Sequence, residues 1–339
     1  MRKLSVMLLS VLLVLVCSVS MAATPYDALD PVTLRFGNGT AIGAAGDVWG
    51  ELFCKYASEV TGGKLVVDYF PNSQLGVDNE MLTQMQGGDL DLVACQPGQL
   101  TPFVPAVAVY DLPLSFAKYD AATIDRALNR SDFTELMDKE YAKSGMVCLG
   151  ALQGATFRVM TSNAKIEKLA DFKGIKIRTM NSPNHLAFWK ALGANPTPLP
   201  FTELYMSLQQ GTVVAQENAN DTNLNMNFHE VQKFLVNTRH ILYLNQLLIN
   251  KERFESLDPA YQAAIKEAIG KATADIAPTL TKLDHDSRDK LVAGGMQDLT
   301  YDNAFYDEVI KAAQPVYADI RKAIGDEVVD SLNKALEGK

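Results

Sequence analysis

Two arginines in apolar, strand-like surroundings are the residues of this chain best suited to holding a ligand. Arg158 lies in "ATFRVMTSN", and Arg178 lies in "GIKIRTM", where a strand leads into a helix start at 181–183. Arginine is rarely buried without a partner, and its planar fork suits a carboxylate or a phosphate held by two hydrogen bonds. One such arginine is more often an edge-strand surface charge. With a second in the same region, the surface charge and the ligand fork are equally good interpretations.

The sequence lacks the common patterns of catalysis. The segment "GNGTAIG" (37–43) misses the dinucleotide-binding spacing by one residue, and neither a GxxxxGK[ST] phosphate loop nor a GxSxG elbow occurs. No HxxxH or HExxH spacing links the histidines, which are His185, His229, His240 and His285. We therefore predict a binding protein with no cofactor and no metal. An exported enzyme acting on a carboxylate is the rival, and it would need a nucleophile or an acid–base pair near Arg178.

The N-terminus predicts export. A basic head, an apolar run and the small-x-small pattern of Ser20-Met21-Ala22 are typical of a signal peptide over residues 1–22. A membrane anchor is the alternative, since about 20 apolar residues can span a bilayer. The formal net charge of −9 becomes −11 once Arg2 and Lys3 are removed with the leader. This balance argues against nucleic acid and anionic membranes as partners. Cys54, Cys95 and Cys148 then remain, without a CxxC pair, and free thiols are favoured over a disulfide.

The order of apolar runs predicts an α/β fold with two lobes, each built on a mostly parallel sheet. Predicted strands alternate with helices in the first part, and the pattern then recurs. Ser182 is a good N-cap with Pro183 at the first helical position, and Thr202 is predicted to cap the next helix. The predicted strands are 32–39, 64–70, 89–95, 174–180 and 212–218, and the helices between them include 77–88, a segment ending at Gly193, and 202–211.

The last hundred residues change character. A strand-like run at 241–250 is predicted to cross from one lobe to the other. A long helix is predicted from Asp258-Pro259 to about 293–295, with a kink or a split at Pro278, because proline removes a helical hydrogen bond. A helix pair follows over 303–337.

The segment "GIKIRTMNSPNHLAFWKALGANPTPLPFTELYMSLQQGTVVAQEN", together with "NSQLGVDNEMLTQMQGGDLDL" and "GATFRVMTSN", resembles the DctP-type solute receptors of tripartite ATP-independent periplasmic (TRAP) transporters. The resemblance extends over essentially the whole chain after the leader. It implies a monomeric periplasmic receptor, a two-lobed clamp with a long helix crossing both lobes, which closes on a small carboxylate and delivers it to the TRAP membrane permease. The implied lobes are 23–155 plus 244–283, and 156–243 plus 284–339.

The same resemblance implies the ligand contacts. In the family, the arginine matching Arg178 makes a bidentate salt bridge to the ligand carboxylate. The further implied contacts are a second cation, an amide beside the carboxylate, an aromatic packing position and a polar group on the first strand, which match Arg158, Asn218, Phe201 and Asn38. Gln96 stands where sialic-acid receptors carry a glutamate, which argues against sialic acid.

Departures from the family bear on the ligand. Ala219 replaces a usual proline after "QEN", and Asp221 follows. If Asp221 faces the ligand, it would repel a second carboxylate and accept an ammonium or a hydroxyl; a role as a helix N-cap is equally well supported. Trp189, with Phe188 and Phe201, is a candidate apolar wall, although a helical tryptophan is more often a core residue. We expect a monocarboxylate (an amino, hydroxy or aromatic acid), with a C4-dicarboxylate receptor or a sensor-coupled receptor as alternatives.

Overall fold

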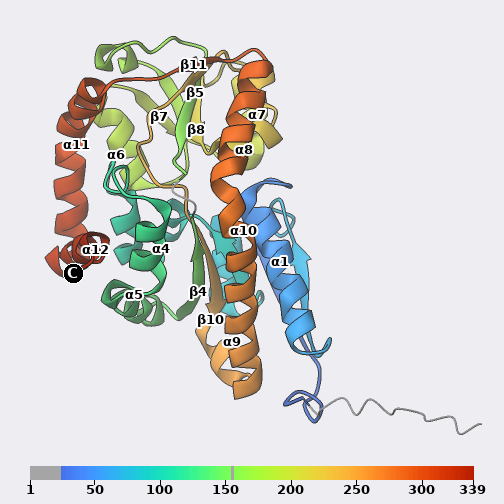
Figure 1. Cartoon of the computed structure of the whole chain (residues 1–339). Helices are drawn as coiled ribbons and strands as arrows, with labels where there is room; N and C mark the ends of the chain where they lie inside the picture. The colour runs from blue at the N-terminus through green and yellow to red at the C-terminus, as the bar shows by residue number, and fades with distance from the viewer. Residues whose placement is uncertain (1–23, 154–155) are drawn as a thin grey trace, which may run out of the picture.

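The computed structural model describes residues 24–153 and 156–339, and these form two α/β lobes (Figure 1). The predicted leader, residues 1–22, lies outside the described residues. Both predicted features of the fold class, the two sheets with flanking helices and the long helix, are present. Among residues 24–153 and 156–339, no helix has both the length and the apolar character that crossing a bilayer demands.

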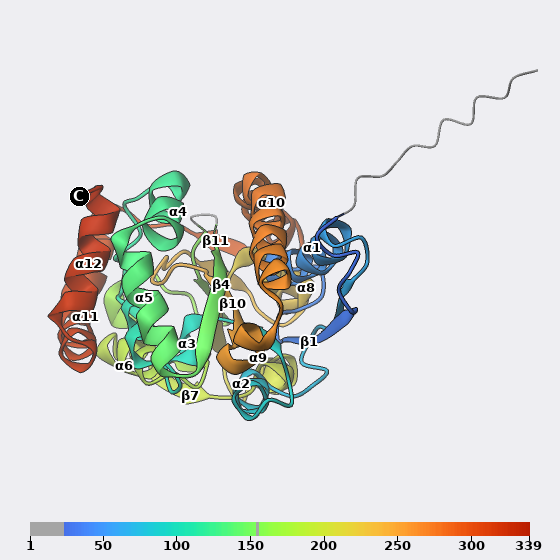
Figure 2. The same cartoon turned by 90° about the horizontal axis from the view of Figure 1, so that it is seen from below.

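Lobe I contains a five-stranded sheet in the order β2-β1-β3-β10-β4, in which only β10 is antiparallel to its neighbours. Its strands are β1 (Val32–Asn38), β2 (Leu65–Phe70), β3 (Leu92–Cys95), β4 (Met146–Leu152) and β10 (Asn245–Asn250). Figure 2 shows helices on both sides of β4 and β10. One face is covered by α1 (Ala45–Val60) and α10 (Pro259–Ala293); the other faces α2 (Asp78–Gly87), α3 (Pro97–Leu100), the 3₁₀ helix η1 (Pro105–Asp111), α4 (Ala121–Asn129) and α5 (Asp132–Lys143).

Lobe II contains a six-stranded sheet in the order β11-β9-β5-β8-β6-β7, in which β5 is antiparallel to both neighbours. The strands are β5 (Val159–Ser162), β6 (Lys176–Thr179), β7 (Asn195–Pro198), β8 (Ala215–Asn218), β9 (Phe234–Val236) and β11 (Gln297–Leu299). The short helices of this lobe are η2 (Leu169–Phe172), α6 (Pro183–Ala191), η3 (Phe201–Glu203), α7 (Leu204–Gln209), α8 (Asn220–Asn225) and η4 (Phe228–Glu230). The remaining helices are α9 (Lys251–Ser256), which follows β10, and the C-terminal α11 (Asn303–Ile324) and α12 (Asp326–Glu337).

Residues 156–158, before β5, pair with residues 241–243, between β9 and β10. The chain therefore passes from one lobe to the other within 241–250, as predicted, because β10 (Asn245–Asn250) already belongs to the sheet of lobe I. Arg158 N–H donates to Ile241 O at 2.9 Å, and Tyr243 N–H donates to Thr156 O at 2.9 Å. This pairing is a two-stranded connection between the lobes. A hinge at this connection stays a prediction.

Helix α10 runs past both lobes as one continuous element of 35 residues. Of the kink or split predicted at Pro278, the split is wrong, because the helix continues through the proline from Pro259 to Ala293, whereas the kink stays a prediction. Its apolar residues on either side of Pro278 explain this: Ile276 and Leu280 pack in the core of lobe I, whereas Leu291 packs in lobe II. Tertiary packing on both sides therefore offsets the hydrogen bond that the proline cannot make.

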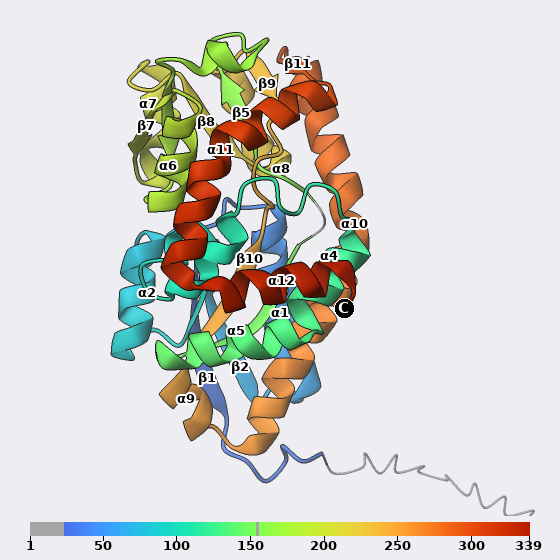
Figure 3. The same ribbon diagram turned by 90° about the vertical axis from the view of Figure 1, so that its left-hand side faces the viewer.

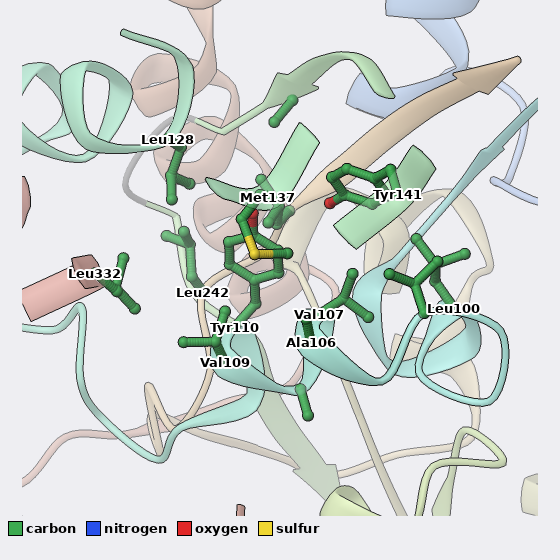
Figure 4. Close-up of a cluster of buried hydrophobic side chains, with 14 of the residues drawn as sticks. Leu100, Ala106, Val107, Val109, Tyr110, Leu128, Met137, Tyr141, Leu242 and Leu332 are labelled. Atoms are coloured by element: carbon green, nitrogen blue, oxygen red, sulfur yellow. The ribbon is translucent and has the colours of Figure 1, made fainter. Parts of the chain in front are cut away.

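The C-terminal residues are divided between the lobes, which differs from the predicted assignment of 284–339 to lobe II alone. The first half of α11 packs in lobe II through Phe305 and Val309, and its second half reaches lobe I through Val316. Figure 3 shows α11 running from one lobe to the other and α12 lying across α4 and α5. In Figure 4, Leu332 of α12 belongs to the same apolar cluster as Tyr110 of η1.

Local sequence signals set several helix ends. The Ser182 side chain accepts the N–H of His185 and Pro183 opens α6, as predicted. Gly88 ends α2 with φ 84°, a left-handed conformation that glycine adopts without a steric penalty. Thr202 is not the predicted cap: it lies inside the 3₁₀ turn η3, and α7 begins two residues later. All three described cysteines are free thiols, and burial raises the pKa of Cys54 to about 12.

Candidate functional site

A cavity lies between the lobes where several strands of both sheets end. The space along its wall that no protein atom occupies, open solvent included, is about 440 Å³. Polar side chains are the larger number of its lining residues, and apolar groups share the exposed wall with them about equally. The lining residues are Gly39, Thr40, Ala41, Asp78, Ala94, Cys95, Gln96, Gln99, Arg158, Arg178, Met180, Phe201, Asn218, Thr222, Tyr243 and Asn245.

Arg178 brings a partly unpaired guanidinium to this cavity. It belongs to β6, is 1% exposed, and donates from Nε to Leu199 O at 3.0 Å. Its guanidinium carbon lies 5.8 Å from the centroid of Phe201. Nη1 is buried with no hydrogen-bond partner among the described residues. Burial lowers the pKa of Arg178 to about 10 although Glu217 opposes this shift, so a bound anion would relieve an unfavourable charge.

Arg158 is positioned differently, because its charge is already neutralised by Glu217. Nε donates to Glu217 Oε2, Nη2 donates to Oε1 of the same carboxylate at 3.1 Å, and Nη1 donates to Gln96 Oε1 across the lobe boundary. Burial by itself would raise the pKa of Glu217, but Arg158 and hydrogen bonds from two histidines hold it well below its usual range. Sequence reasoning missed Glu217, although a glutamate in the apolar run "TVVAQEN" was an available signal.

Two histidines complete the network around Glu217. His240 Nε2 lies 3.1 Å from Glu217 Oε2, and His185 Nδ1 lies 3.5 Å from Oε1. His185 Nε2 also lies 3.2 Å from Asp111 of lobe I. Burial alone would lower the pKa of His185, but the carboxylates of Asp111 and Glu217 raise it to about 9. The network is thus a set of compensated charges behind the cavity wall. In the described part of the chain, no group of three or more His, Cys, Asp or Glu side chains could hold a metal.

Asp78, the first residue of α2, is the acidic group that does line the cavity. Its Oδ1 is buried with no hydrogen-bond partner among the described residues. Burial raises the pKa of Asp78 to about 6, with Arg178 opposing the shift. A Cβ atom on Gly39 would collide with Oδ1, so glycine is required there for this close approach. Neither residue was predicted, because only the fold brings the β1–α1 loop and the start of α2 together.

The predicted residues divide into those that the fold brings to the cavity and those that it does not. Arg178, Arg158, Gln96, Phe201 and Asn218 all line it. The Oδ1 atom of Asn218 is buried without a hydrogen-bond partner among the described residues, so it is free to accept from a ligand. That these five contact a ligand stays a prediction.

Asn38 and Trp189 do not line the cavity, contrary to prediction. The side chain of Asn38 is used within lobe I: Nδ2 donates to Gly46 O at 3.1 Å, and Oδ1 accepts from Thr40 N–H at 2.9 Å. It therefore fixes the loop that lines the cavity. Trp189 is fully buried in the core of lobe II, where its ring centroid is 5.1 Å from that of Phe188. Apolar burial of this large side chain outweighs exposure in a polar cleft.

Asp221 lies beside the cavity but does not line it, and it does not face a ligand there. Its Oδ1 accepts from Thr222 N–H at 2.7 Å in its own helix. Its Oδ2 accepts from Ala45 N–H at 2.8 Å, at the start of α1 in the other lobe. The predicted role as N-cap of the helix that follows is wrong, because Ala219 is the N-cap of α8 and Asp221 lies inside that helix. Asp221 instead accepts from the start of α1.

The two lobes and the cavity between them, with the partly unpaired guanidinium of Arg178 in its wall, have the arrangement of a ligand-binding clamp. Residues 45–323 match the family model described as bacterial extracellular solute-binding protein, family 7. Because the match covers most of the chain, the chain belongs to this family. Its members bind small acids and deliver them to TRAP membrane permeases, and they are receptors and not enzymes.

Individual relatives are similar over most of their length. The chain is 29% identical over 301 residues to the sialic acid-binding periplasmic protein SiaP of Vibrio cholerae, covering 88% of this chain and 92% of that one. It is 32% identical to the 2,3-diketo-L-gulonate-binding periplasmic protein YiaO of Escherichia coli, covering 74% and 76%. The sugar acid binding protein DctPAm of Advenella mimigardefordensis, solved with galactonate, superposes with a TM-score of 0.85 at 25% identity, covering 91% and 99%.

Proposed function

We propose that this protein is a periplasmic receptor for a monocarboxylate that carries hydroxyl groups. The observation that carries the proposal is the pair of unsatisfied groups in one cavity: Nη1 of Arg178 and Oδ1 of Asp78. The first needs an acceptor with negative charge, and the second needs a donor. A carboxylate and a hydroxyl on one small molecule supply both.

The charge balance of the cavity favours one ligand carboxylate over two. Glu217 already compensates Arg158, so Arg178 is the cation left for a ligand. An ionised Asp78 would repel a second carboxylate in the same cavity. The expectation of a monocarboxylate is thus kept, but its basis moves from Asp221 to Asp78.

The cavity wall favours hydroxyls over an aromatic body. Phe188 and Trp189 belong to the core of lobe II, and the aromatic wall predicted from them is therefore missing. Amide groups of Gln99, Asn218 and Asn245 line the cavity. Such amide groups can both donate a hydrogen bond to a ligand hydroxyl and accept one from it. A ligand ammonium only donates, so it would use these groups less completely.

The named ligands of some relatives have the same chemistry, although another relative is named for C4-dicarboxylates. Sialic acid, 2,3-diketo-L-gulonate and galactonate appear in the names of proteins similar to this one. Each of these acids has one carboxylate and several hydroxyls. Gln96 stands where sialic-acid receptors carry a glutamate, and its side chain accepts from Arg158. A smaller hydroxy acid such as galactonate is therefore a better first candidate than sialic acid.

A calorimetric comparison of D-galactonate, L-serine and succinate tests the proposal. We expect wild type to bind galactonate more tightly than serine and succinate. Asp78→Asn should weaken galactonate binding and strengthen succinate binding, because the repulsion is removed. Asp68→Asn, at an exposed carboxylate of β2, is the matched control and should change neither. Succinate binding to wild type as tightly as galactonate, unaffected by Asp78→Asn, would refute the charge argument and favour a C4-dicarboxylate receptor.

A further inference from the structure

Asp221 links the two lobes through a hydrogen bond to the protein backbone. It is 5% exposed and lies in α8 of lobe II. Oδ1 accepts from Thr222 N–H, which fixes the carboxylate, and Oδ2 accepts from Ala45 N–H of lobe I at 2.8 Å. The second bond joins residues 176 positions apart. It can exist only while the lobes are together.

Helix α1 has no side-chain cap of its own. Its N-cap residue is Ala44, whose methyl group cannot accept a hydrogen bond. Ala44 and Ala45 are 0% and 5% exposed, so water is excluded from this helix start. Within residues 24–153 and 156–339, Asp221 is the acceptor found for the Ala45 N–H. A buried N–H without a partner is costly, and a carboxylate at a helix N-terminus is also favoured by the helix dipole.

The contact lies beside α10 and next to the ligand cavity, but it is not part of that cavity's wall. A small cavity beside it is lined by Ala45, Asp221, Tyr243, Leu280 and Asp284, among others. Helix α10 packs against both α1 and α8, and Figure 1 shows these two helices along its length. The neighbouring Thr222 lines the ligand cavity, whereas Asp221 does not. Asp221 is therefore placed to sense lobe closure without touching the ligand.

We propose that Asp221 is a positioning residue that stabilises the closed clamp by capping α1 from the opposite lobe. Opening exposes both partners to water, and closing restores the cap. This proposal rests on the proposed receptor function, because it assumes a clamp that opens and closes. The bond is the same whatever ligand is present. Its loss should therefore change the affinity for every ligand by one common factor, expressed in the dissociation rate.

The test compares Asp221→Ala, Asp221→Asn and a control, Asp284→Asn. Asp284 lies in the same small cavity but accepts from Asn220 of α8, so its loss breaks no bond to α1. Small-angle scattering of the ligand-free proteins reports the open–closed balance. Stopped-flow measurements with D-galactonate and D-erythronate report association and dissociation.

We expect Asp221→Ala to release both acids about tenfold faster with unchanged association, equivalent to about 1.4 kcal/mol. Its ligand-free radius of gyration should increase. Asp221→Asn keeps an acceptor oxygen, and asparagine caps helices as well as aspartate does. Its release rate and radius of gyration should therefore lie close to those of wild type. Asp284→Asn should behave as wild type.

Different factors for the two acids, or a change in association alone, would show direct ligand contact and overturn the proposal. So would unchanged scattering together with unchanged release. If neither acid binds wild type, the proposed ligand chemistry fails, and scattering of the ligand-free proteins alone decides the role of Asp221. Thermal unfolding verifies that each variant is folded; if Asp221→Ala is not, Ala45→Pro replaces it, because proline suits the first position of a helix and removes the donor of the same hydrogen bond.

Discussion

Replacing Arg178 is the most direct perturbation of the candidate site. Its Nε is held by Leu199 O, and Nη1 points to no protein partner in the described structure. Arg178→Ala removes the cation and leaves the ligand carboxylate desolvated and unpaired. Truncating one partner of a buried charge pair typically costs about 3–5 kcal/mol. The predicted loss of affinity is therefore at least about a hundredfold and reaches a few thousandfold.

Arg178→Lys should recover part of this loss. A lysine ammonium is a point charge, so it cannot bond Leu199 O and both carboxylate oxygens with the geometry of a planar fork. We expect an affinity between those of wild type and Arg178→Ala. The matched control is Arg130→Ala, which removes a largely exposed arginine paired with Asp125. A surface pair of this kind contributes little.

Isothermal titration calorimetry with D-galactonate measures all four proteins. Affinity of Arg178→Ala within a few fold of wild type would show that the carboxylate binds elsewhere, and Arg158 would then be the next candidate. Equal affinities of the lysine variant and wild type would instead show a single-point ionic contact and reject the bidentate geometry.

Three further outcomes follow from the hinge and the perturbed pKa values. Galactonate should reduce the radius of gyration in small-angle scattering, and an unchanged radius at saturation would contradict closure. The raised pKa of Asp78, about 6, means that the folded protein holds this proton more tightly than the unfolded chain, so its contribution to stability falls as pH rises from about 4 to 6. Asp78→Asn should abolish that fall and be more stable by up to about 3 kcal/mol at pH 7.5 in urea unfolding; a less stable variant would refute this. The pKa of His185, raised to about 9 by Asp111 and Glu217, means that this residue stabilises the fold below pH 6.5, and about 3 kcal/mol should be lost between pH 6.5 and 9. His185→Gln should lack this loss, and identical pH profiles for both proteins would show that His185 is neutral.

The sequence by itself determined the class of fold and the main cation. Alternation of apolar strands with capped helices predicts α/β lobes, and these patterns depend on neighbours a few residues apart. The start of α6 at Ser182-Pro183 and the position of Arg178 at the end of β6 follow from such local signals. A strand end at the edge of a sheet is where ligands bind in this fold class, so Arg178 was identifiable without coordinates.

Only the tertiary structure shows which of the other charged side chains are already paired within the protein. Arg158 and Glu217 lie 59 positions apart, and only the antiparallel pairing of β5 with β8 shows that they neutralise each other. The same holds for Asp221, whose partner Ala45 lies in the opposite lobe. Side-chain pairing over such separations leaves no periodic trace in one sequence. For this reason the sequence did not indicate Asp78, and it left Asp221 open between a ligand contact and a helix cap. Both roles depend on which groups of the other lobe lie within hydrogen-bonding distance, and only the tertiary structure determines that.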